Sequence, residues 1–293
     1  MKLIYKVSNN IYENIKEVLK VEFSMSDRLL LKLKKMQRIT LNGKPVYVHH
    51  SLHLGDIIEC DLDYEEDNSN IVPTSISLSI IYEDDCYLII DKPTGLPIHP
   101  SAYHYEDSLS NGVRFYFDKI GLKKKIRPVN RLDKDTSGLV VFAKNEYVQE
   151  CLVKQMQSKE FVKKYIAIVD RNLKSKEGII NAPIARKNNS IIERCIRDDG
   201  ESAITHYKVL FSNKENNFDI VECTLETGRT HQIRVHFAHI GHPLLGDTLY
   251  GKASSLIDRQ ALHSYYISFI HPIEKVKKVY ESNLPNDMKN MIM

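Results

Sequence analysis

Cysteine is scarce in this chain, and long apolar runs are absent. The five cysteines are scattered, odd in number, and never form a C-x-x-C pair. This spacing argues against a disulfide framework and against a zinc ribbon, and it favours reduced thiols. No apolar run approaches the ~18 residues that a membrane helix requires, and the first residues do not have the pattern of a signal peptide. We therefore expect a cytoplasmic protein that has no membrane partner.

Net charge is small as well, because 41 Lys and Arg stand against 38 Asp and Glu, which gives +3. The total charge therefore does not identify a partner, but the distribution of charge indicates one. Basic residues without acids gather at positions 28–38, and a second basic cluster extends over positions 114–134. Such clusters are typical of proteins that bind a phosphate backbone, although a solvated helix face can have the same composition.

The chain is long enough, at 293 residues, for one large domain and a small one. We expect a small module at residues 1–65 and a larger domain at residues 75–293. Between them, residues 66–74 are acidic and polar, as in a linker. An acidic segment repels phosphate, so we expect it to lie away from the binding face.

The N-terminal module shows a mixed pattern of helices and short strands. Ile11, Ile15 and Val18 have helical spacing, and Ser26 can cap a second helix that has leucines on one face and basic residues on the other. An Asn-Gly turn at Asn42 then separates two short strands. The pattern predicts a small α/β module with a basic helix.

Residues 131–144 combine a charged half with an apolar half. Residues 139–142 form a continuous apolar run that predicts a buried strand. Just before the run, short polar side chains and a glycine predict a turn that carries Arg131, Asp133 and Asp135. A carboxylate on a loop fixed to a buried strand is a frequent arrangement of catalytic groups, although a charged surface loop has the same residue types.

The whole string at 131–144 resembles the catalytic motif of the RluA-type pseudouridine synthases, which isomerise uridine to pseudouridine within RNA. The resemblance continues through residues 91–100, the pair Lys163 and Tyr165, and the string T-G-R-T-H-Q-I-R-V-H within residues 226–236. It covers residues from about 80 to 272. Several motifs in the same order are far more specific than any one of them.

In this family the first Asp of the R-L-D string is the essential catalytic residue, which corresponds to Asp133. The chain departs from the usual pattern at two places: Asn130 stands where the family has His, and Asp91 stands where it has Asn. The resemblance implies an α+β fold with a large mixed, mainly antiparallel sheet flanked by helices and loops.

The N-terminal module in turn resembles an S4 RNA-binding domain, whose basic helix and following turn pack onto structured RNA. This resemblance implies recognition of RNA shape and phosphates with little reading of sequence. The residues that it places against RNA are Arg28, Lys32, Lys35, Arg38 and Asn42.

The implied reaction requires the uracil to leave its ribose, turn and re-attach through carbon, so the nucleotide must be flipped out of the helix. Arg131 is expected to fill the vacated place, and Lys163 to contact the RNA.

Asp133 either attacks the sugar as a nucleophile or removes its 2′ proton to give a glycal, and the sequence leaves both routes open. Tyr165 is expected to stack on the base and help to remove its C5 proton. We expect a helix from Thr230 to position 240, with Arg229 at its start. Arg229 is predicted to pair with Asp133 and keep it ionised.

No cofactor is expected, because the reaction involves neither redox change nor hydrolysis. No metal is expected either, because the histidines at 231–242 lack the spacing of a ligand set.

We expect a monomer that acts on ribosomal RNA of the large subunit, with tRNA as the second candidate. A non-catalytic RNA-binding protein is the main competing class. A glycoside or nucleoside hydrolase using Asp133 and Asp135 is weaker, because carboxylates two residues apart on one turn are poorly placed to flank a bond.

Overall fold

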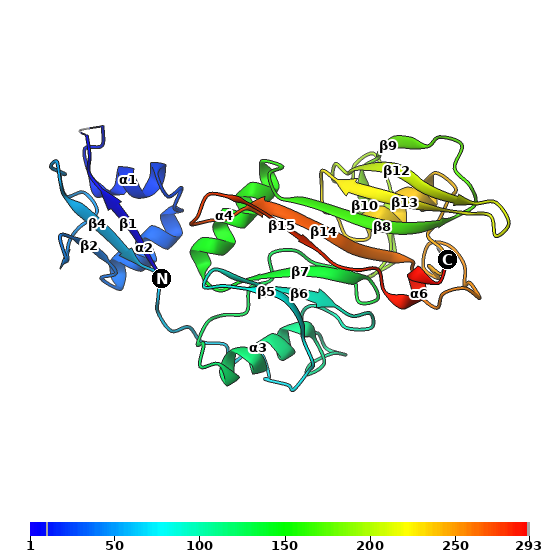
Figure 1. Ribbon diagram of the computed structural model, residues 1–293, viewed down its shortest axis with the longest axis horizontal. Helices are drawn as coiled ribbons and strands as arrows, with labels where there is room; N and C mark the ends of the chain where they lie inside the picture. The colour runs from blue at the N-terminus through cyan, green and yellow to red at the C-terminus, as the bar shows by residue number, and fades with distance from the viewer. Residues whose placement is uncertain (10, 292–293) are drawn as a thin grey trace.

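The structure is a computed structural model that describes residues 1–9 and 11–291. The N-terminal module lies at one end of the molecule, where two helices pack on a small antiparallel sheet of order β1-β4-β2-β3 (Figure 1). Its elements are β1 (Lys2–Lys6), α1 (Ile15–Val21), α2 (Asp27–Lys35), β2 (Ile39–Leu41), β3 (Lys44–Pro45) and β4 (Ile57–Asp61).

Local sequence signals account for most of this module. The Ser26 side chain accepts a hydrogen bond from the Leu29 amide and so caps α2, as predicted. Asn42 and Gly43 both have positive φ, of 51° and 78°, which the turn between β2 and β3 requires. Ile11 was wrongly placed on a helix, because α1 begins at Ile15 and the Ile11 side chain is 71% exposed.

A nine-stranded sheet forms the body of the molecule (Figure 1). The strand order is β5-β6-β7-β14-β8-β13-β12-β9, and β15 also pairs with β14. The β7–β14 pair is parallel and the other pairs are antiparallel, which confirms the predicted mixed, mainly antiparallel sheet. The strands are β5 (Ser79–Glu83), β6 (Tyr87–Lys92), β7 (Ser137–Ala143), β8 (Val162–Asp170), β9 (Glu177–Asn181), β12 (Ile204–Asn213), β13 (Phe218–Leu225), β14 (Leu262–Ile270) and β15 (Lys277–Glu281).

Helices and one small hairpin flank this sheet. The helices are α3 (Leu109–Lys119), α4 (Glu146–Gln157), α5 (Gln232–His239) and α6 (Asn286–Lys289), and the hairpin consists of β10 (Ile184–Arg186) and β11 (Arg194–Ile196). Every residue of β7 is buried, as its apolar run predicted. Among the described residues, no helix combines the length and the apolar character needed to cross a lipid bilayer.

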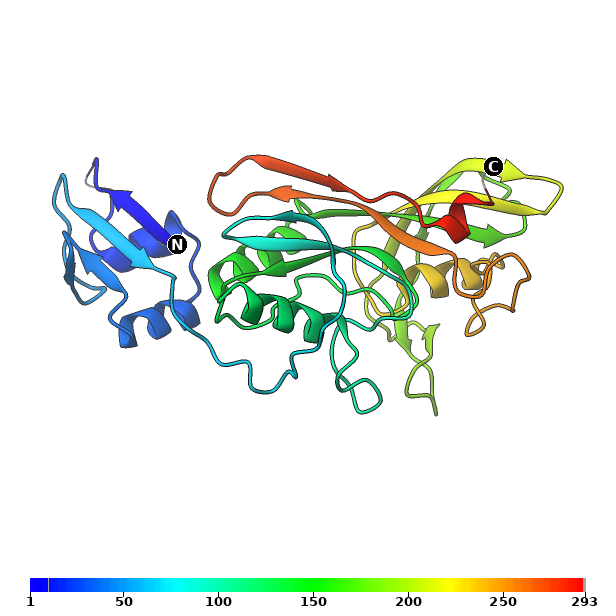
Figure 2. The ribbon, with the colours of Figure 1, turned by 60° about the horizontal axis from the view of Figure 1, so that its bottom comes forward.

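The module and the larger body share apolar packing. One buried cluster contains Leu33 and Cys60 of the module together with Tyr87, Tyr147 and Phe269 of the body. Figure 2 shows the module beside the large sheet, joined to it by an irregular segment. The boundaries predicted at residues 65 and 75 stay a prediction, and the apolar core continues across them.

The acidic segment between the two parts is tied to the body. The carboxylate of Glu66 is buried and contacts the Arg127 guanidinium at 2.5 and 2.7 Å. Asp63 and Glu65, which come just before this segment, pair with Lys124 and Lys123, at 2.8 and 3.1 Å. The prediction that this part of the basic cluster at 114–134 forms a free phosphate-binding face is therefore wrong, because neighbouring acids neutralise it.

Candidate active site

The loop that carries Asp133 is fixed at both of its ends. Lys92 is buried, and its ammonium group donates to the carbonyls of Pro93, Leu96 and Lys134, each at 2.8 Å. Burial lowers the pKa of Lys92 to about 7, although the nearby Asp135 and Asp133 oppose the shift. Three acceptors match the three N–H bonds of an ammonium group, so we take Lys92 to be charged when the loop is in this conformation.

The other end of the loop depends on Asn130 and Gly138. The Asn130 amide is buried and bonds to the main chain of β7, at Leu139 O (3.0 Å) and Val141 N (2.9 Å). The departure from the family pattern at this position is thus a structural contact. Gly138 has φ +112° and lies so close to Ser264 of β14 that a Cβ would collide with the backbone. Only glycine fits this position, where β7 and β14 pair.

A cavity of about 770 Å³ opens beside this loop. Its lining brings together the five residues that were predicted for the reaction centre, although they are far apart in the sequence: Arg131, Asp133, Lys163, Tyr165 and Arg229. Tyr165 is buried on β8, while Arg131 is exposed at the rim. The cavity is of the size that proteins use for small ligands, roughly 300–1,000 Å³.

The ion pair of Asp133 differs from the prediction. Arg234, on α5, donates from Nη1 to Asp133 Oδ2 at 3.0 Å. The same guanidinium holds Asp247 through two bonds of 2.7 and 2.9 Å, and the Asp247 side chain is fully buried. These contacts, against the opposing effect of burial, raise the pKa of Arg234, so its positive charge is permanent. No described residue donates a hydrogen bond to Asp133 Oδ1.

The predicted pair between Arg229 and Asp133 is therefore wrong. Arg229 contacts Glu201 at 3.2 Å and the Ser202 carbonyl at 3.1 Å. The helix starts at Gln232, later than predicted, because His231 has a left-handed backbone (φ 58°) that turns the chain before α5. The sequence carries a signal for the pairing of Arg234. This arginine lies within an apolar helical stretch, and an arginine buried there is rarely without an acid partner.

Lys163 and Tyr165 lie on β8 and line the cavity as predicted. Burial raises the pKa of Tyr165, with the Asp133 charge adding to the shift, so the phenol stays protonated at neutral pH. Burial lowers the pKa of Lys163, and no acid among the described residues pairs with it. Gly228 leaves room for its ammonium group, since a Cβ there would lie 3.3 Å from Lys163 Nζ.

In the N-terminal module, most of the residues predicted to bind RNA contact the protein itself. Arg28 and Lys32 each pair with Glu146 of α4 at 2.8 Å, although the Arg28 side chain remains 76% exposed. Arg38 pairs with Asp61 at 2.5 Å, and Asn42 donates to Asp56 at 2.7 Å. Lys35 is exposed and has no acid partner among the described residues. Arg28 and Lys32 on the basic face of α2 are therefore paired with an acid of the body, while RNA contact by these residues stays a prediction.

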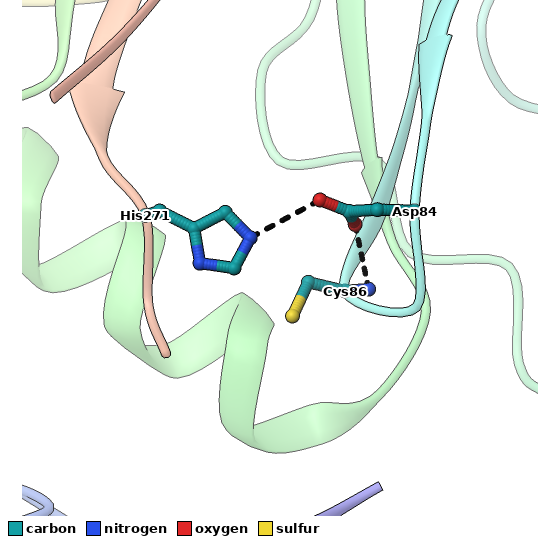
Figure 3. A group of neighbouring side chains, drawn as sticks. All are labelled: Asp84, Cys86 and His271. Carbon is teal, nitrogen blue, oxygen red and sulfur yellow. Dashed lines mark hydrogen bonds and ion pairs between the residues drawn. The ribbon is translucent and has the colours of Figure 1, made fainter. Parts of the chain in front are cut away.

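A group of potential metal ligands lies outside the cavity, where Asp84 and Cys86 of the β5–β6 turn meet His271 after β14 (Figure 3). Their polar atoms already have partners. His271 Nε2 donates to Asp84 at 3.1 Å, its Nδ1 accepts amides at 3.0 and 3.2 Å, and Asp84 Oδ1 accepts the amides of Cys86 and Tyr87. These hydrogen bonds account for the arrangement of the three side chains, and they join the β5–β6 turn to the end of β14.

Comparison with known proteins agrees with this architecture. The profile of the RNA pseudouridylate synthase family matches residues 86–239. The "Uncharacterized RNA pseudouridine synthase YhcT" of Bacillus subtilis (strain 168) is 39% identical over 94% of this chain and 90% of its own. The "Ribosomal large subunit pseudouridine synthase D" of Yersinia pestis is 36% identical over 87% and 82%.

Solved structures show the same fold. Human RNA Pseudouridylate Synthase Domain Containing 1 aligns with a TM-score of 0.59 at 22% identity, over 75% of this chain and 94% of that chain. The structural likeness shows the fold, whereas the sequence relatives and the family profile also show the family. The chain belongs to the RNA pseudouridylate synthase family, with relatives of the RluA and RluD type, and is an isomerase that converts uridine to pseudouridine in RNA.

Proposed function

We propose that this enzyme modifies uridines in the ribosomal RNA of the large subunit and that Asp133 is its catalytic carboxylate. The observation that carries the proposal is the asymmetric environment of Asp133. Oδ2 is held by Arg234 at 3.0 Å, Oδ1 has no donor among the described residues, and the side chain is 27% exposed beside the cavity. The substrate class follows from the relatives named as large-subunit ribosomal enzymes, such as those of Yersinia pestis and Xanthomonas campestris.

This environment suits both routes that are open to Asp133. The fixed positive charge of Arg234 holds Oδ2, so that the other oxygen is available to attack the sugar or to take its 2′ proton. In either case the flipped nucleotide occupies the cavity of about 770 Å³, with its ribose at Asp133. After the glycosidic bond breaks, the uracil must turn within the same cavity before its C5 bonds to the ribose.

Tyr165 supplies an aromatic surface to the cavity. Because burial raises the pKa of its phenol, Tyr165 is a hydrogen-bond donor and a stacking surface, and it needs a neighbouring base before it can accept the C5 proton. Lys163 provides a cation without an acid partner in the described chain, which suits a phosphate or a uracil carbonyl oxygen. Arg131 is exposed and lines the cavity, which supports the proposal that its side chain fills the place vacated by the flipped nucleotide.

A neighbouring loop extends this surface. Residues 101–107 project from the body (Figure 2), and Tyr103 and Tyr105 there are 94% and 60% exposed. Lys134 Nζ lies 3.2 Å from His104 Nε2, so the loop contacts the residue that follows Asp133. Exposed aromatic rings beside basic side chains are a frequent platform for unpaired bases. We propose that this loop contacts the RNA around the flipped nucleotide.

The test compares Asp133→Asn with Asp135→Asn, since Asp135 lies on the same turn and its carboxylate is not placed in the reaction. Asp133→Asn is expected to reduce turnover by at least roughly 10⁴-fold, while RNA binding remains within about threefold, because the lost group is required in the chemical step. Asp135→Asn is expected to retain most activity. The measurement is pseudouridine formation in ribosomal RNA from a strain that lacks the gene.

Two outcomes would contradict the proposal. Near-normal activity of Asp133→Asn would remove the catalytic assignment. Modification of tRNA, with ribosomal RNA unmodified, would keep the assignment and replace the substrate class.

A further inference from the structure

His231 stands next to Asp133 in a backbone conformation that a residue with a side chain rarely adopts. Its φ and ψ are 58° and 19°, and its side chain does not cap the helix that follows. A left-handed non-glycine residue is strained, and such residues gather at functional sites. Here the conformation directs a mostly buried imidazole toward the cavity, with Nε2 at 3.8 Å from Asp133 Oδ2.

The other imidazole nitrogen is fixed by Tyr250. The Tyr250 hydroxyl oxygen accepts the Arg194 amide of β11 at 2.8 Å and lies 2.8 Å from His231 Nδ1. Burial raises the pKa of Tyr250, so the hydroxyl keeps its single proton. A buried hydroxyl proton needs an acceptor, and among the described residues His231 Nδ1 supplies it. The neutral imidazole then carries its own proton on Nε2, on the side of Asp133.

A single buried acid, Asp247, bonds both Arg234 and the main chain of Tyr250. Asp247 grips Arg234 through both oxygens and also accepts the amides of Leu249 and Tyr250, at 3.0 and 3.2 Å. The Arg234 guanidinium lies over the Tyr250 ring, 5.1 Å from its centroid. The Arg234–Asp133 ion pair and the Tyr250–His231 contact are therefore both connected to Asp247.

We propose that Tyr250 and His231 are positioning residues that act through Asp133. Tyr250 selects the tautomer of His231, and the resulting Nε2–H stands on the Oδ2 side of the carboxylate, so that Oδ1 faces the cavity. This inference rests on the proposed role of Asp133. It gives a functional reason for the strained backbone of His231 and for the Tyr250 hydroxyl group, which lies far from the reacting atoms.

The charge state of the imidazole follows from the groups around it. Five ionisable or charged groups face His231. They are Asp133 from the catalytic loop, Arg234 from the helix that follows, Arg194 from β11, and Asp247 and Tyr250 from the turn after that helix. Burial, assisted by the arginines and opposed by the acids, lowers the pKa of His231. A proton donated to Nδ1 by Tyr250 also disfavours a second proton there, so the imidazole stays neutral near pH 7.

Nitrogen-15 NMR of the full-length protein tests the tautomer without any substrate. The His231 signal is assigned by its loss in His231→Gln. We expect an Nε2–H imidazole with an accepting Nδ1 at pH 7 in the wild type, and a mixture of tautomers in Tyr250→Phe. An Nδ1–H tautomer, or an imidazolium at pH 7 in the wild type, would overturn the proposal whatever the activity of any variant.

Kinetics test the role. Tyr250→Phe is expected to lower the single-turnover rate at saturating RNA roughly tenfold, with RNA affinity within about twofold, because one hydrogen bond that orients the site is lost. Without the hydroxyl donor the pKa of His231 rises, so the acid limb of the pH–rate profile should move to higher pH. Tyr116→Phe, which removes a hydroxyl bonded to Glu83 at 2.5 Å outside the site, is the matched control and should behave as the wild type.

A pair of substitutions separates positioning from packing. In His231→Gln the side-chain amide can reach the place of Nε2–H, whereas in His231→Leu no donor remains. We expect the Gln variant to be several-fold faster than the Leu variant at equal thermal stability. Equal rates, or a Tyr250→Phe enzyme with the wild-type profile, would refute this inference. If Asp133→Asn is inactive in the same assay, the proposed function stands while this inference fails.

Discussion

The N-terminal module and the cavity both contain the basic residues expected of an RNA-binding surface, yet in the described chain three of the four predicted basic residues of the module are paired with acids, and two of the three in the cavity are not. In the module, Lys32 and Arg28 pair with Glu146 at 2.8 Å, and Arg38 pairs with Asp61 at 2.5 Å. In the cavity, Lys163 and Arg131 have no acid partner among the described residues. A count of basic residues therefore does not locate the phosphate-binding surface, because the position of the acids decides which cations are available.

The difference has an energetic meaning. A cation that is already paired must give up its partner before it meets a phosphate, so its net gain on binding RNA is small. A cation without a partner gains the full interaction and releases a counterion from the RNA. We therefore expect the cavity to contribute more to affinity per basic residue than the inner face of α2 does.

Among the basic residues, the largest expected effect concerns two arginines of one sequence string. Arg234→Gln removes the partner of Asp133 and leaves the buried Asp247 uncompensated, so we expect turnover to fall at least roughly hundredfold and the free energy of unfolding to fall by about 3 kcal/mol. Arg229→Gln, in which only the contacts to Glu201 and Ser202 are lost, should change either quantity little. Single-turnover assays and urea denaturation of both variants decide between the two arginines. A greater loss of turnover in Arg229→Gln would restore the pairing predicted from the sequence.

The contrast between the two arginines shows where sequence reasoning ends. The motif string identified the region, the buried strand β7 and the carboxylate of Asp133. It could not tell which arginine turns inward, because that choice depends on the left-handed conformation of His231, which moves the start of α5 to Gln232. No propensity rule predicts a strained residue, since such strain is maintained by tertiary contacts.

Charge pairs between residues distant in the sequence are the second feature that local patterns could not predict. The amphipathic pattern and the Ser26 cap predicted α2, and the structure confirms both. Whether the basic face of α2 meets solvent or protein depends on Glu146, which lies 114 positions from Lys32 in the sequence. The same holds for Glu66 and Arg127, which are 61 positions apart. Local patterns place charges on a face, and only the packing of distant elements shows what covers that face.

A smaller effect should separate the two kinds of cation directly. Lys163→Met is expected to weaken RNA binding roughly tenfold and to reduce the slope of log affinity against log salt by about 0.7–0.9, as for one phosphate contact. Lys32→Met should change affinity by about twofold or less, since its pairs with Glu146 and Glu66 already satisfy it. Lys164→Met is the matched control for the cavity, because Lys164 pairs with Glu222 at 3.2 Å. Equal slopes for Lys163→Met and the wild type would show that Lys163 meets an uncharged group.

The smallest expected effect tests the acidic segment that shields the basic cluster. Against the opposing effect of burial, the bonds from Arg127 lower the pKa of Glu66 from its usual 4.5. Because the folded pKa lies below the unfolded one, this carboxylate adds stability that is complete above pH 4.5 and is lost as the pH falls through the lowered value. The difference in unfolding free energy between the wild type and Glu66→Gln should therefore be constant at pH 5–7 and shrink as the pH falls below 4.5. Glu65→Gln, at a carboxylate that is 76% exposed, should match the wild type at every pH. A pH-independent difference for Glu66→Gln would mean that the segment is held by its main chain, and that the lysines beside it are free to meet RNA after all.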